Sequence, residues 1–344
     1  MGNRPTIKEI ANEAGVSSAT VSRFINKSGY VNEETAARIQ KVVEKFNFRP
    51  SQIARSLKTQ STHNLALIVP DIQNPFYSRM ANRVQHLLLS RGYTVTLLDS
   101  GGEPAMEMNC LHVAASISVD GILFASISAQ LAILEELEKL RIPVVMINSY
   151  DSCPFDSVHG VRCESTYLAT KYLIHLGHRR IGYAGGTMHT AIENSRYGGY
   201  CKAMQEAGLK VDPSMVFEMG FNSDSGKKSG AYFTALEQMP TAICCGNDLI
   251  ALGVLQVFQK KGIRVPQDVS LTGVDNIIYG ELSSPPLTSV INDSDEFADK
   301  AVSALFDRIE GRYTGEPREY KIERQLVIRG STAEFGGERK REEQ

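Results

Sequence analysis

The sequence predicts an α plus α/β fold, in which an N-terminal helix-turn-helix unit precedes two doubly wound subdomains with parallel sheets. Two observations carry this prediction. Three short helical patterns of apolar residues fill the chain before residue 50, and a glycine separates the first two. From residue 65 onward, short continuous apolar runs alternate with longer helical patterns, which is typical of parallel strands covered on both faces. A chain of 344 residues can bury a substantial core in more than one domain.

The first helix is expected to begin after Thr6, because Thr6-Ile7-Lys8-Glu9 has the form of a capping box. Apolar residues follow at helical spacing, and Gly15 ends the segment with a tight turn. These apolar residues are Ile7, Ile10, Ala11 and Ala14.

Ser17 is expected to cap a second helix, which runs from Ser18 to about Ile25. Its inward stripe consists of Val21, Phe24 and Ile25, and its other face carries Ser18, Ala19, Ser22, Arg23 and Asn26. A third helix is expected to open at Asn32, since the glutamates that follow suit the positive end of the helix dipole. This helix should bury Ala36, Ile39, Val43 and Phe46.

A glycine turn before a helix with small polar residues at its front is typical of helix-turn-helix DNA recognition. Small side chains at Ser17, Ser18 and Ala19 let the helix N-terminus approach a groove closely. Arg23, one turn later, can donate two hydrogen bonds to guanine, which is worth about 1–3 kcal/mol of base discrimination. The alternative interpretation is a three-helix packing domain with a solvated basic face.

A second short helix is expected from Ser51 to Lys58, after the break at Arg49-Pro50. Ile53 and Leu57 lie on one side of it, and two turns are marginally stable alone in water. Leu57 suits insertion between base steps, which kinks the duplex. The alternative is an ordinary linker helix with an outward leucine.

The segment from Thr6 to Lys58 resembles the DNA-binding headpiece and hinge helix of the lactose-repressor (LacI/GalR) family. The resemblance rests on TIKEIANEAGVSSATVSRFIN followed by RPSQIARSLK, and it extends to about residue 332. It implies that Ser18, Ala19 and Arg23 read bases, and that Leu57 is a minor-groove lever with Ala54 packed beside it. It also implies that a further set contacts phosphates or supports the reading helix. That set is Thr6, Ser17, Thr20, Ser22, Asn26 and Tyr30, and Lys58 closes the predicted DNA-binding segment.

Charge is unevenly distributed along the chain. Residues 1–62 contain ten basic and five acidic side chains, whereas the remainder contains 27 basic and 34 acidic ones. A basic headpiece on an acidic body directs phosphate attraction to one end. The N-terminus is polar and no apolar run approaches the length of a membrane span, so we expect a cytoplasmic, nucleoid-associated protein without a membrane partner. The six cysteines show no paired spacing, and we expect reduced thiols.

The remainder of the chain resembles a periplasmic-binding-protein-like core, in which two sets of β-α units form two lobes. The first set comprises strands over 65–69, 94–98, 121–124 and 144–147 with helices over 76–90, 106–116 and 131–140. The second set comprises strands over 181–184, 215–218, 242–245 and 270–274 with helices over 196–207, 228–236 and 251–260. A helix over 294–309 should complete the first set, with crossings between the lobes near 160, 291 and 322.

The domain division predicted from these patterns has five parts. They are a helix-turn-helix domain (1–49), a hinge helix and linker (50–63), a first core subdomain (64–160 with 293–321), a second core subdomain (161–292 with 322–333) and a polar tail (334–344). The tail has no apolar heptads, which argues against a coiled-coil tetramer and for a homodimer.

Polar residues stand where the predicted strands end, and ligands of such folds bind at the carboxyl ends of strands. Carboxylates, amides and an arginine around an aromatic ring suit a polyol or a nucleoside. The candidates are Asp71, Asn74, Phe76, Ser126, Asn148, Arg196 opening a helix, Asn247 and Asp275. Each of these alone is more often a turn or cap residue; together they favour a site.

The resemblance marks the same positions as effector contacts. Arg196 begins an R-x-x-G-Y match, Asn247 begins an N-D-x-x-A-x-G match, and Phe76 matches an aromatic that packs on the ligand ring. Two departures concern the sugar-binding prediction. Asn222 holds the place of an aromatic that often points into the pocket, and Cys163 stands where an acidic residue is usual.

Catalytic motifs are not evident in the sequence. The stretch from Gly220 to Ser229 imitates a phosphate-binding loop, but five residues rather than four separate its glycines. The histidines lack metal-ligand spacing, so we expect neither metal nor cofactor, and no enzyme. The sequence therefore predicts a repressor that binds a pseudo-palindromic operator as a homodimer under control of a small molecule. A carbohydrate is the first expectation for the effector, and a nucleoside or purine the second. The alternative is a solute-binding receptor for transport with the same core.

Overall fold

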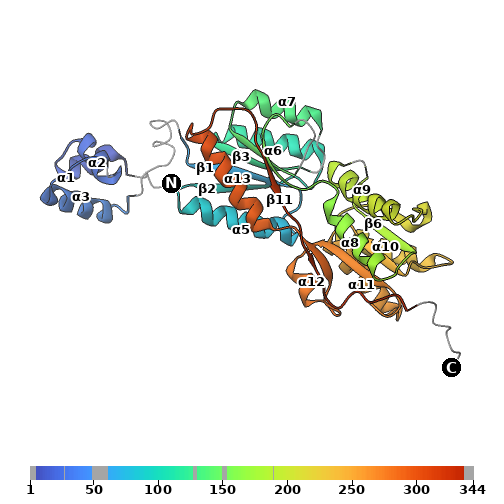
Figure 1. The fold of residues 1–344 in the computed structure, drawn as a ribbon. Coiled ribbons are helices and arrows are strands. Elements are labelled where there is room, and N and C mark those ends of the chain that lie inside the picture. The colour runs from blue at the N-terminus through green and yellow to red at the C-terminus, as the bar shows by residue number, and fades with distance from the viewer. Residues whose placement is uncertain are drawn as a thin grey trace. The chain divides into compact units, whose positions relative to one another are not determined.

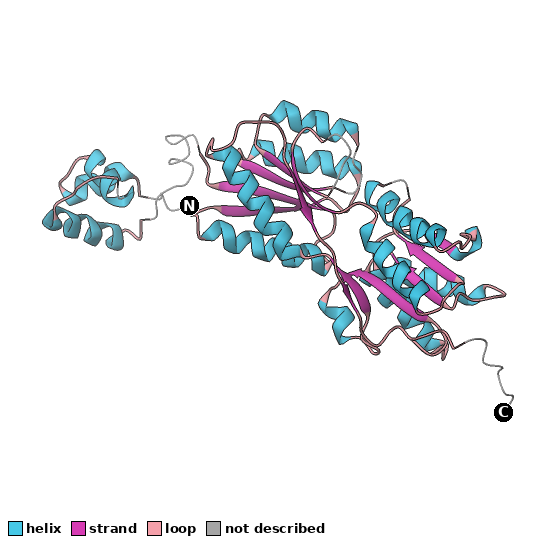
Figure 2. Cartoon of the chain, viewed as in Figure 1, coloured by secondary structure: helices cyan, strands magenta, loops and turns pink. Residues whose placement is uncertain are grey.

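The computed structural model describes residues 5–26, 28–48, 61–126, 130–148, 153–188 and 190–336. The chain forms two compact units, Met1–Thr62 and His63–Gln344. Within the described residues, the first unit contains three helices, and the second contains two six-stranded sheets with helices around them (Figure 1 and Figure 2). The predicted fold class is confirmed.

The headpiece unit consists of α1 (Ile7–Ala14), α2 (Ser18–Asn26) and α3 (Glu33–Lys45). The capping box is present: the Glu9 amide donates to Thr6 Oγ1 at 3.3 Å, and the Thr6 amide donates to Glu9 Oε2 at 2.6 Å. Gly15 has φ 65°, as the turn after α1 requires. Six buried residues form the core, namely Ile10, Ala11, Ala14, Val21, Ile39 and Phe48.

The predicted burial of Phe46 is wrong, because this side chain is 37% exposed. α3 ends at Lys45, and Asn47 then turns the chain with φ 46°. The Phe48 amide consequently donates to the Val43 carbonyl at 2.9 Å, and Phe48 takes the core position that the helical periodicity assigned to Phe46.

The first lobe of the core unit is an entirely parallel sheet in the order β11-β5-β4-β3-β1-β2. Its strands are β1 (Asn64–Val69), β2 (Thr94–Asp99), β3 (Gly121–Ala125), β4 (Val144–Ile147), β5 (Asp156–Gly160) and β11 (Glu319–Ile322). Its helices are α5 (Pro75–Leu89), α6 (Pro104–Ser116), α7 (Leu131–Leu140) and α13 (Ser294–Ile309). The late helix α13 packs beside α5 on this sheet (Figure 1), and Phe297 contributes to the same core as Leu67 and Val145.

The second lobe has the sheet order β12-β10-β9-β8-β6-β7, parallel except for the β10–β12 pair. Its strands are β6 (Ile181–Gly185), β7 (Val216–Glu218), β8 (Ala242–Cys245), β9 (Ser270–Asp275), β10 (Thr288–Ile291) and β12 (Leu326–Val327). Its helices are α8 (Glu164–His175), α9 (Ala191–Glu206), α10 (Ser223–Ala235), α11 (Asp248–Lys260) and α12 (Ile278–Leu282), with a 3₁₀ turn at Pro213–Met215. Cys244 and Cys245 are buried in β8, and all six cysteines are free thiols.

Three predicted helix starts are wrong, because the caps lie earlier in the chain. Asn247 caps α11, so this helix begins at Asp248 rather than at residue 251. Thr190 caps α9 through the Glu193 amide, so Arg196 lies in the second turn rather than at the opening of the helix. Asn222 caps α10 through the Ser225 amide, so this helix begins five residues before the predicted Lys228. Three short segments join the lobes, after Gly160, after Ile291 and after Ile322.

Candidate functional site

The front of α2 exposes small side chains. The Thr20 amide donates to Ser17 Oγ at 3.1 Å, and the two hydroxyls lie 2.9 Å apart, which closes the cap predicted for this helix. Ser18 and Ala19 are exposed in the first turn, while Val21 is fully buried on the opposite face. The headpiece core therefore holds α2 by its buried face and leaves the face with Ser18 and Ala19 exposed to solvent.

Arg23 is exposed on the same open face of α2, and no hydrogen bond or ion pair to another described residue holds its guanidinium. Asn26 instead folds back on the helix, with Nδ2 donating to the Ser22 carbonyl at 2.9 Å. Tyr30 is 89% exposed. Thr6 caps α1, as described above. The predictions for Ala54, Leu57 and Lys58 and for the helix over 51–58 lie outside the described residues.

A cavity lies between the two lobes of the core unit, at the carboxyl ends of their strands. Its volume is about 40 Å³. The residues that line it are Asp71, Asn74, Phe76, Tyr77 and Asn148 from the first lobe, Ile192, Arg196, Phe221, Asn247 and Asp275 from the second, and Asn292 from a crossing segment. The structure thus brings together seven of the nine predicted effector residues.

Arg196 and Asp275 form the charged centre of the cavity. Arg196 Nη2 donates to Asp275 Oδ1 at 3.2 Å, and Nη1 donates to the Gly246 carbonyl at 2.7 Å. Asp275 is buried with φ 103°, a conformation that few non-glycine residues adopt. Burial raises the pKa of Asp275, and the nearby guanidinium of Arg196 opposes that rise. The Arg196 guanidinium also lies 5.2 Å from the centre of the Phe221 ring.

Two amides at the edge of the cavity, Asn247 and Asn74, are held by backbone contacts. Asn247 Oδ1 accepts from the Ile250 amide at 2.9 Å and Nδ2 donates to the Phe221 carbonyl at 2.9 Å, so both ends of this side chain are engaged. Asn74 Oδ1 accepts from the Phe76 amide at 3.0 Å and caps α5. Asn148 differs from them: it has φ 91°, and its Nδ2 is buried without an acceptor among the described residues. Asn74 and Asn247 thus stabilise the ends of their strands.

Four lining residues were missed by the sequence analysis. Tyr77 and Phe221 each lie beside a residue that was named, and Ile192 lies one turn before Arg196. Asn292 lies just beyond β10, where its Nδ2 donates to Asp275 Oδ1 at 3.2 Å and its Oδ1 is buried without a donor among the described residues. The signal in the sequence that could have identified Tyr77 and Phe221 was their position next to Phe76 and Asn222.

Ser126 and Asn222 are corrections, since neither lines the cavity. Ser126 is buried in the first lobe and donates to Glu107 Oε1 at 2.6 Å. The exposed Asn222 caps α10, and Phe221 supplies the aromatic that this loop was expected to lack. Cys163, the other expected departure, does not line the cavity either; its amide donates to Ser195 Oγ at 2.9 Å and it has φ 61°.

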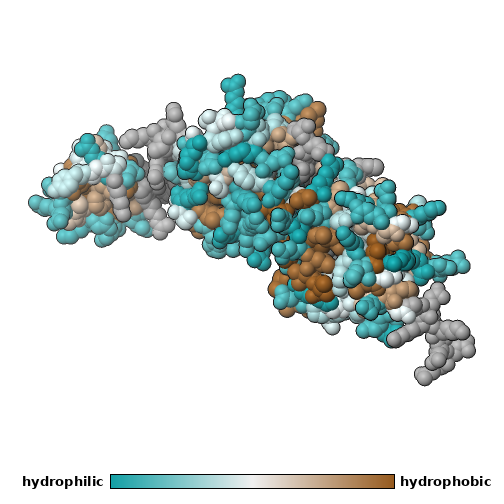
Figure 3. All heavy atoms as spheres, in the orientation of Figure 1, coloured by the Kyte–Doolittle hydropathy of each residue, from teal (hydrophilic) through white to brown (hydrophobic). Residues whose placement is uncertain are grey.

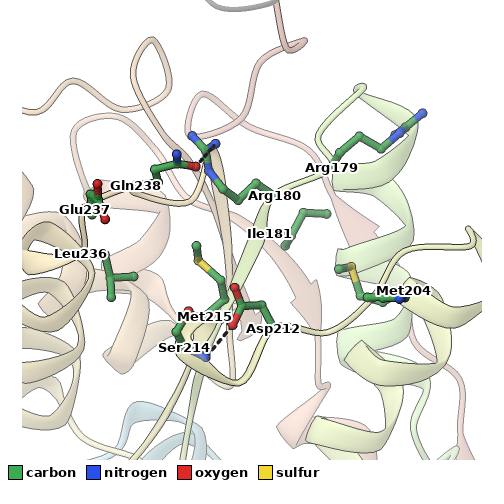
Figure 4. Close-up of a pocket in the computed structure, with 11 residues that line it drawn as sticks. Arg179, Arg180, Ile181, Met204, Asp212, Ser214, Met215, Leu236, Glu237 and Gln238 are labelled. Atoms are coloured by element: carbon green, nitrogen blue, oxygen red, sulfur yellow. Dashed lines mark hydrogen bonds between the residues drawn. The ribbon is translucent and has the colours of Figure 1, made fainter.

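A second hollow, of about 550 Å³, lies at the amino ends of the second lobe's strands. In Figure 4, Arg180 turns toward Gln238, whereas Arg179 points away from the group. Arg180 Nε donates to the Met239 carbonyl at 2.6 Å, so it supports the backbone. Among the described residues, no cluster of three or more potential ligands could hold a metal, and no helix is long and apolar enough to cross a membrane.

Comparison with known proteins identifies both parts of the chain. Residues 6–51 match the model of bacterial regulatory proteins of the lacI family, and residues 170–332 match that of the periplasmic binding protein-like domain. The chain is 35% identical over 328 residues to the HTH-type transcriptional repressor PurR of Aliivibrio salmonicida (strain LFI1238), covering 95% of this chain and 98% of that protein. It is 36% identical over 328 residues to the same-named repressor of Vibrio campbellii (strain ATCC BAA-1116), with the same coverage.

Two solved structures agree with the fold. A complex of the transcriptional regulator CelR with cellobiose has a TM-score of 0.72 and 28% identity, covering 95% of this chain and 100% of that one. The lac repressor dimer bound to operator and the anti-inducer ONPF has a TM-score of 0.86 at 21% identity, covering 96% of this chain and 100% of that one. The headpiece decides against a solute-binding receptor. The chain is a DNA-binding transcription regulator controlled by a small-molecule effector, and it belongs to the lacI family of bacterial regulatory proteins.

Proposed function

We propose that this chain represses transcription as a homodimer on a pseudo-palindromic operator in the cytoplasm, and that an uncharged carbohydrate binds in the cavity between its lobes. The observation that carries the proposal is the Arg196–Asp275 pair, buried in a cavity to which both lobes contribute. A ligand in this position contacts both lobes at once, so its binding energy depends on how they are placed.

The chemistry of the lining favours a neutral polyhydroxyl ligand. Asp71 and Asp275 accept hydrogen bonds from hydroxyl groups, and the rings of Phe76 and Phe221 offer apolar faces to a sugar ring. Among the described residues that line the cavity, Arg196 is the one cation, and its two Nη atoms already donate to Asp275 and to a carbonyl. A phosphate or carboxylate on the ligand would therefore meet two carboxylates and a guanidinium that is already paired.

Ligand binding requires the lobes to move apart, because the cavity of about 40 Å³ is far smaller than the few hundred Å³ of an ordinary ligand site. Closure on the ligand then shifts the equilibrium between lobe arrangements by the difference in affinity for them. In the proposed mechanism this shift rotates the first lobes of the dimer. The rotation changes whether the paired helices predicted over 51–58 can fold and insert Leu57 into the operator.

Exposed apolar side chains support the homodimer. On the second lobe, Ile278, Tyr279 and Leu282 of α12 are 54%, 56% and 73% exposed, and Figure 3 shows a hydrophobic patch in the region of α12. On the first lobe, Leu97 of the edge strand β2 and Val113 of α6 are 39% and 43% exposed. Contiguous exposed apolar surface marks an interface, and a second copy of the chain is the partner that a palindromic operator requires.

A nucleoside or purine base is the second candidate for the effector. The observation that favours it is the presence of two aromatic rings, Phe76 and Phe221, in the lining of one small cavity. A planar heterocycle stacks on such rings, and its donors can pair with Asp275.

Thermal unfolding in the presence of single compounds tests the effector proposal. The panel contains glucose, ribose, cellobiose, adenosine, adenine and glucose 6-phosphate. We expect a neutral saccharide to raise the Tm of the native chain and not that of Asp275→Asn, while the control Glu237→Gln at the second hollow responds like the native chain. Stabilisation that persists in Asp275→Asn would place the ligand elsewhere, and stabilisation by glucose 6-phosphate alone would refute the neutral class.

Operator binding is tested on fragments obtained by in vitro selection with the full chain. We expect the selected fragments to contain an inverted repeat and the complex to contain two protein chains in sedimentation. The compound found by thermal unfolding should change operator affinity. Selection of fragments without inverted symmetry, bound by a single chain, would contradict the dimeric repressor.

A further inference from the structure

A short turn joins the effector cavity to the exposed helix α12. It consists of Asp275, the last residue of β9, followed by Asn276 and Ile277. Asp275 and Asn276 both have positive φ, at 103° and 53°. Few non-glycine residues adopt such a conformation, and it persists only where the surrounding structure holds it. The turn therefore needs partners that fix its backbone.

The buried carboxylate of Asp248 supplies two of these contacts. Asp248 is the second residue of the N-D-x-x-A-x-G match, and it does not line the effector cavity. Its Oδ2 accepts from the Ile277 amide at 2.8 Å. Its Oδ1 accepts from the Ser289 hydroxyl at 2.6 Å, and Ser289 Oγ accepts in turn from the Asn276 amide at 3.1 Å. One carboxylate thus holds two successive amides of the turn, the second of them through Ser289.

The neighbouring residues complete the support of the turn. Gly273 in β9 makes room for the carboxylate, since a methyl group at this position would overlap Asp248 Oδ1. Arg329 Nη2 donates to Asn276 Oδ1 at 2.7 Å, and its Nη1 donates to the Leu287 carbonyl at 2.8 Å. The backbone and the side chain of Asn276 are therefore both engaged.

Further hydrogen bonds connect the turn to the cavity at one end and to α12 at the other. At the cavity end, Asp275 Oδ1 accepts from Arg196 and from Asn292, each at 3.2 Å. At the other end, the Leu287 amide donates to the carbonyl of Gly280 within α12 at 2.7 Å. A change in the turn would consequently move groups at both ends.

We propose that Asp248 is a positioning residue, which holds the 275–277 turn in its conformation with positive φ and so sets the position of both the Asp275 carboxylate and α12. The same buried side chain then links the effector cavity to the apolar face of α12 that the proposed homodimer uses. The inference rests on the proposed function, but every measurement below uses the protein alone. Failure of the effector or dimer proposal would leave these measurements unaffected, so the failures can be told apart.

Two substitutions at position 248 separate positioning from packing. Asp248→Leu keeps the branched shape of the side chain but removes both acceptors. Asp248→Asn keeps an acceptor for the Ile277 amide and a polar group against Ser289. Burial raises the pKa of Asp248 to about 8, so the neutral acid, which asparagine resembles, is accessible near neutral pH. Asparagine should therefore rescue what leucine loses.

Hydrogen exchange of the full chain measures how firmly the turn is held. In Asp248→Leu the Asn276 and Ile277 amides should exchange about tenfold faster than in the native chain, because their acceptors are lost or displaced. The Leu287 amide, which reports on α12, should also accelerate. The Leu271 amide, near the start of β9, is the internal reference and should stay within about threefold of its native rate. In Asp248→Asn all four amides should stay within that range.

The side-chain amide of Asn292 reports on the position of Asp275, because its Nδ2 donates to Asp275 Oδ1. Its NMR signal, assigned by its loss in Asn292→Ala, should shift in Asp248→Leu toward the value that it has in Asp275→Ala. In Asp248→Asn it should keep its native value. A residue that only fills space would not produce this shift.

Ser289→Ala and Ser229→Ala form a matched pair that leaves Asp248 in place and decides the matter should Asp248→Leu fail to fold. Each removes a fully buried hydroxyl from the second lobe. Ser289 contacts the turn, whereas Ser229 donates to a carbonyl within α10. Ser289→Ala should accelerate exchange of the Asn276 amide about tenfold and shift the Asn292 signal. Ser229→Ala should do neither.

Either of two results would overturn the proposal. Equal acceleration of the turn amides and of the Leu271 amide would make Asp248 a packing residue of the whole lobe. An Asn292 signal that keeps its native value in both Asp248→Leu and Ser289→Ala would show that the turn does not set the position of Asp275.

Discussion

Arg23→Ala is the sharpest test of base reading by α2. The guanidinium is exposed and makes no hydrogen bond or ion pair to the described residues, and its aliphatic stem passes beside Gly29. The buried face of α2, around Val21, is untouched by the change. The headpiece should therefore lose no more than about 0.5 kcal/mol of stability, as is usual for a surface substitution.

Base discrimination should fall by much more. Two hydrogen bonds from one guanidinium to guanine are worth about 1–3 kcal/mol, which corresponds to about a 5- to 150-fold loss of affinity for the operator. The affinity for random DNA should fall far less, because the substitution removes only one of the positive charges by which the headpiece attracts DNA phosphates. The ratio of operator affinity to random-DNA affinity should thus fall, and one operator position should lose its preference.

Fluorescence anisotropy at fixed salt, on the selected operator and on a random fragment of equal length, measures that ratio. Arg38→Ala is the matched control, because Arg38 is an exposed guanidinium on α3 whose Nη2 only donates to Thr35 Oγ1 at 3.4 Å. It should leave the ratio within about twofold of the native value. Equal losses for Arg23→Ala on both fragments would refute the base-reading role of this residue.

Four further outcomes are expected. Asp156→Ala should cost about 3 kcal/mol of stability in urea titration, because Arg308 and Arg318 lose their buried carboxylate partner and keep only Asp307 and backbone carbonyls as acceptors. Burial raises the pKa of Asp156, but hydrogen bonds from these arginines outweigh that effect and lower the pKa overall. The stability that ionised Asp156 contributes is therefore present above pH 4 and should decrease as pH falls further. A native chain that is equally stable at pH 3 and pH 6 would contradict this. Leu57→Ala should leave the Tm of the core unchanged but reduce operator bending in a circular-permutation gel assay. Undiminished bending would refute the proposed insertion of Leu57 into the minor groove. Asp275→Ala should keep operator affinity within about threefold and abolish its response to the effector, and a normal response would place the site elsewhere.

The headpiece could be predicted from the sequence almost completely, because local rules determine it. Thr6, Ser17 and Asn32 cap their helices through amides three residues away, and Gly15 supplies the positive φ of the turn. The predicted burial of Phe46 failed because the chain turns at Asn47, and the helical spacing of apolar residues gives no signal of that turn. The apolar strands of the core were equally visible, since a strand buried on both faces needs a continuous apolar run.

Strand β5 shows what the sequence could not reveal. Asp-Ser-Val-His-Gly has no apolar run, yet every residue of β5 is buried in the sheet. Burial of Asp156 depends on Arg308 and Arg318, which lie 152 and 162 positions away and donate to its oxygens. A pairing of such range leaves no local pattern, so only the tertiary structure could identify this strand and its partner β11.

For the cavity, too, part of the site could be predicted from the sequence and part could not. Strand ends and motif spacing placed Arg196, Asn247 and Asp275 near one another, because parallel strands bring their carboxyl ends to one edge. Side-chain direction was decided by packing: Phe221 faces the cavity because its neighbour Asn222 turns to cap α10. The sequence determined which residues stand at the ends of elements, and the tertiary structure decided which of them share a space, because that depends on contacts between segments far apart in the chain.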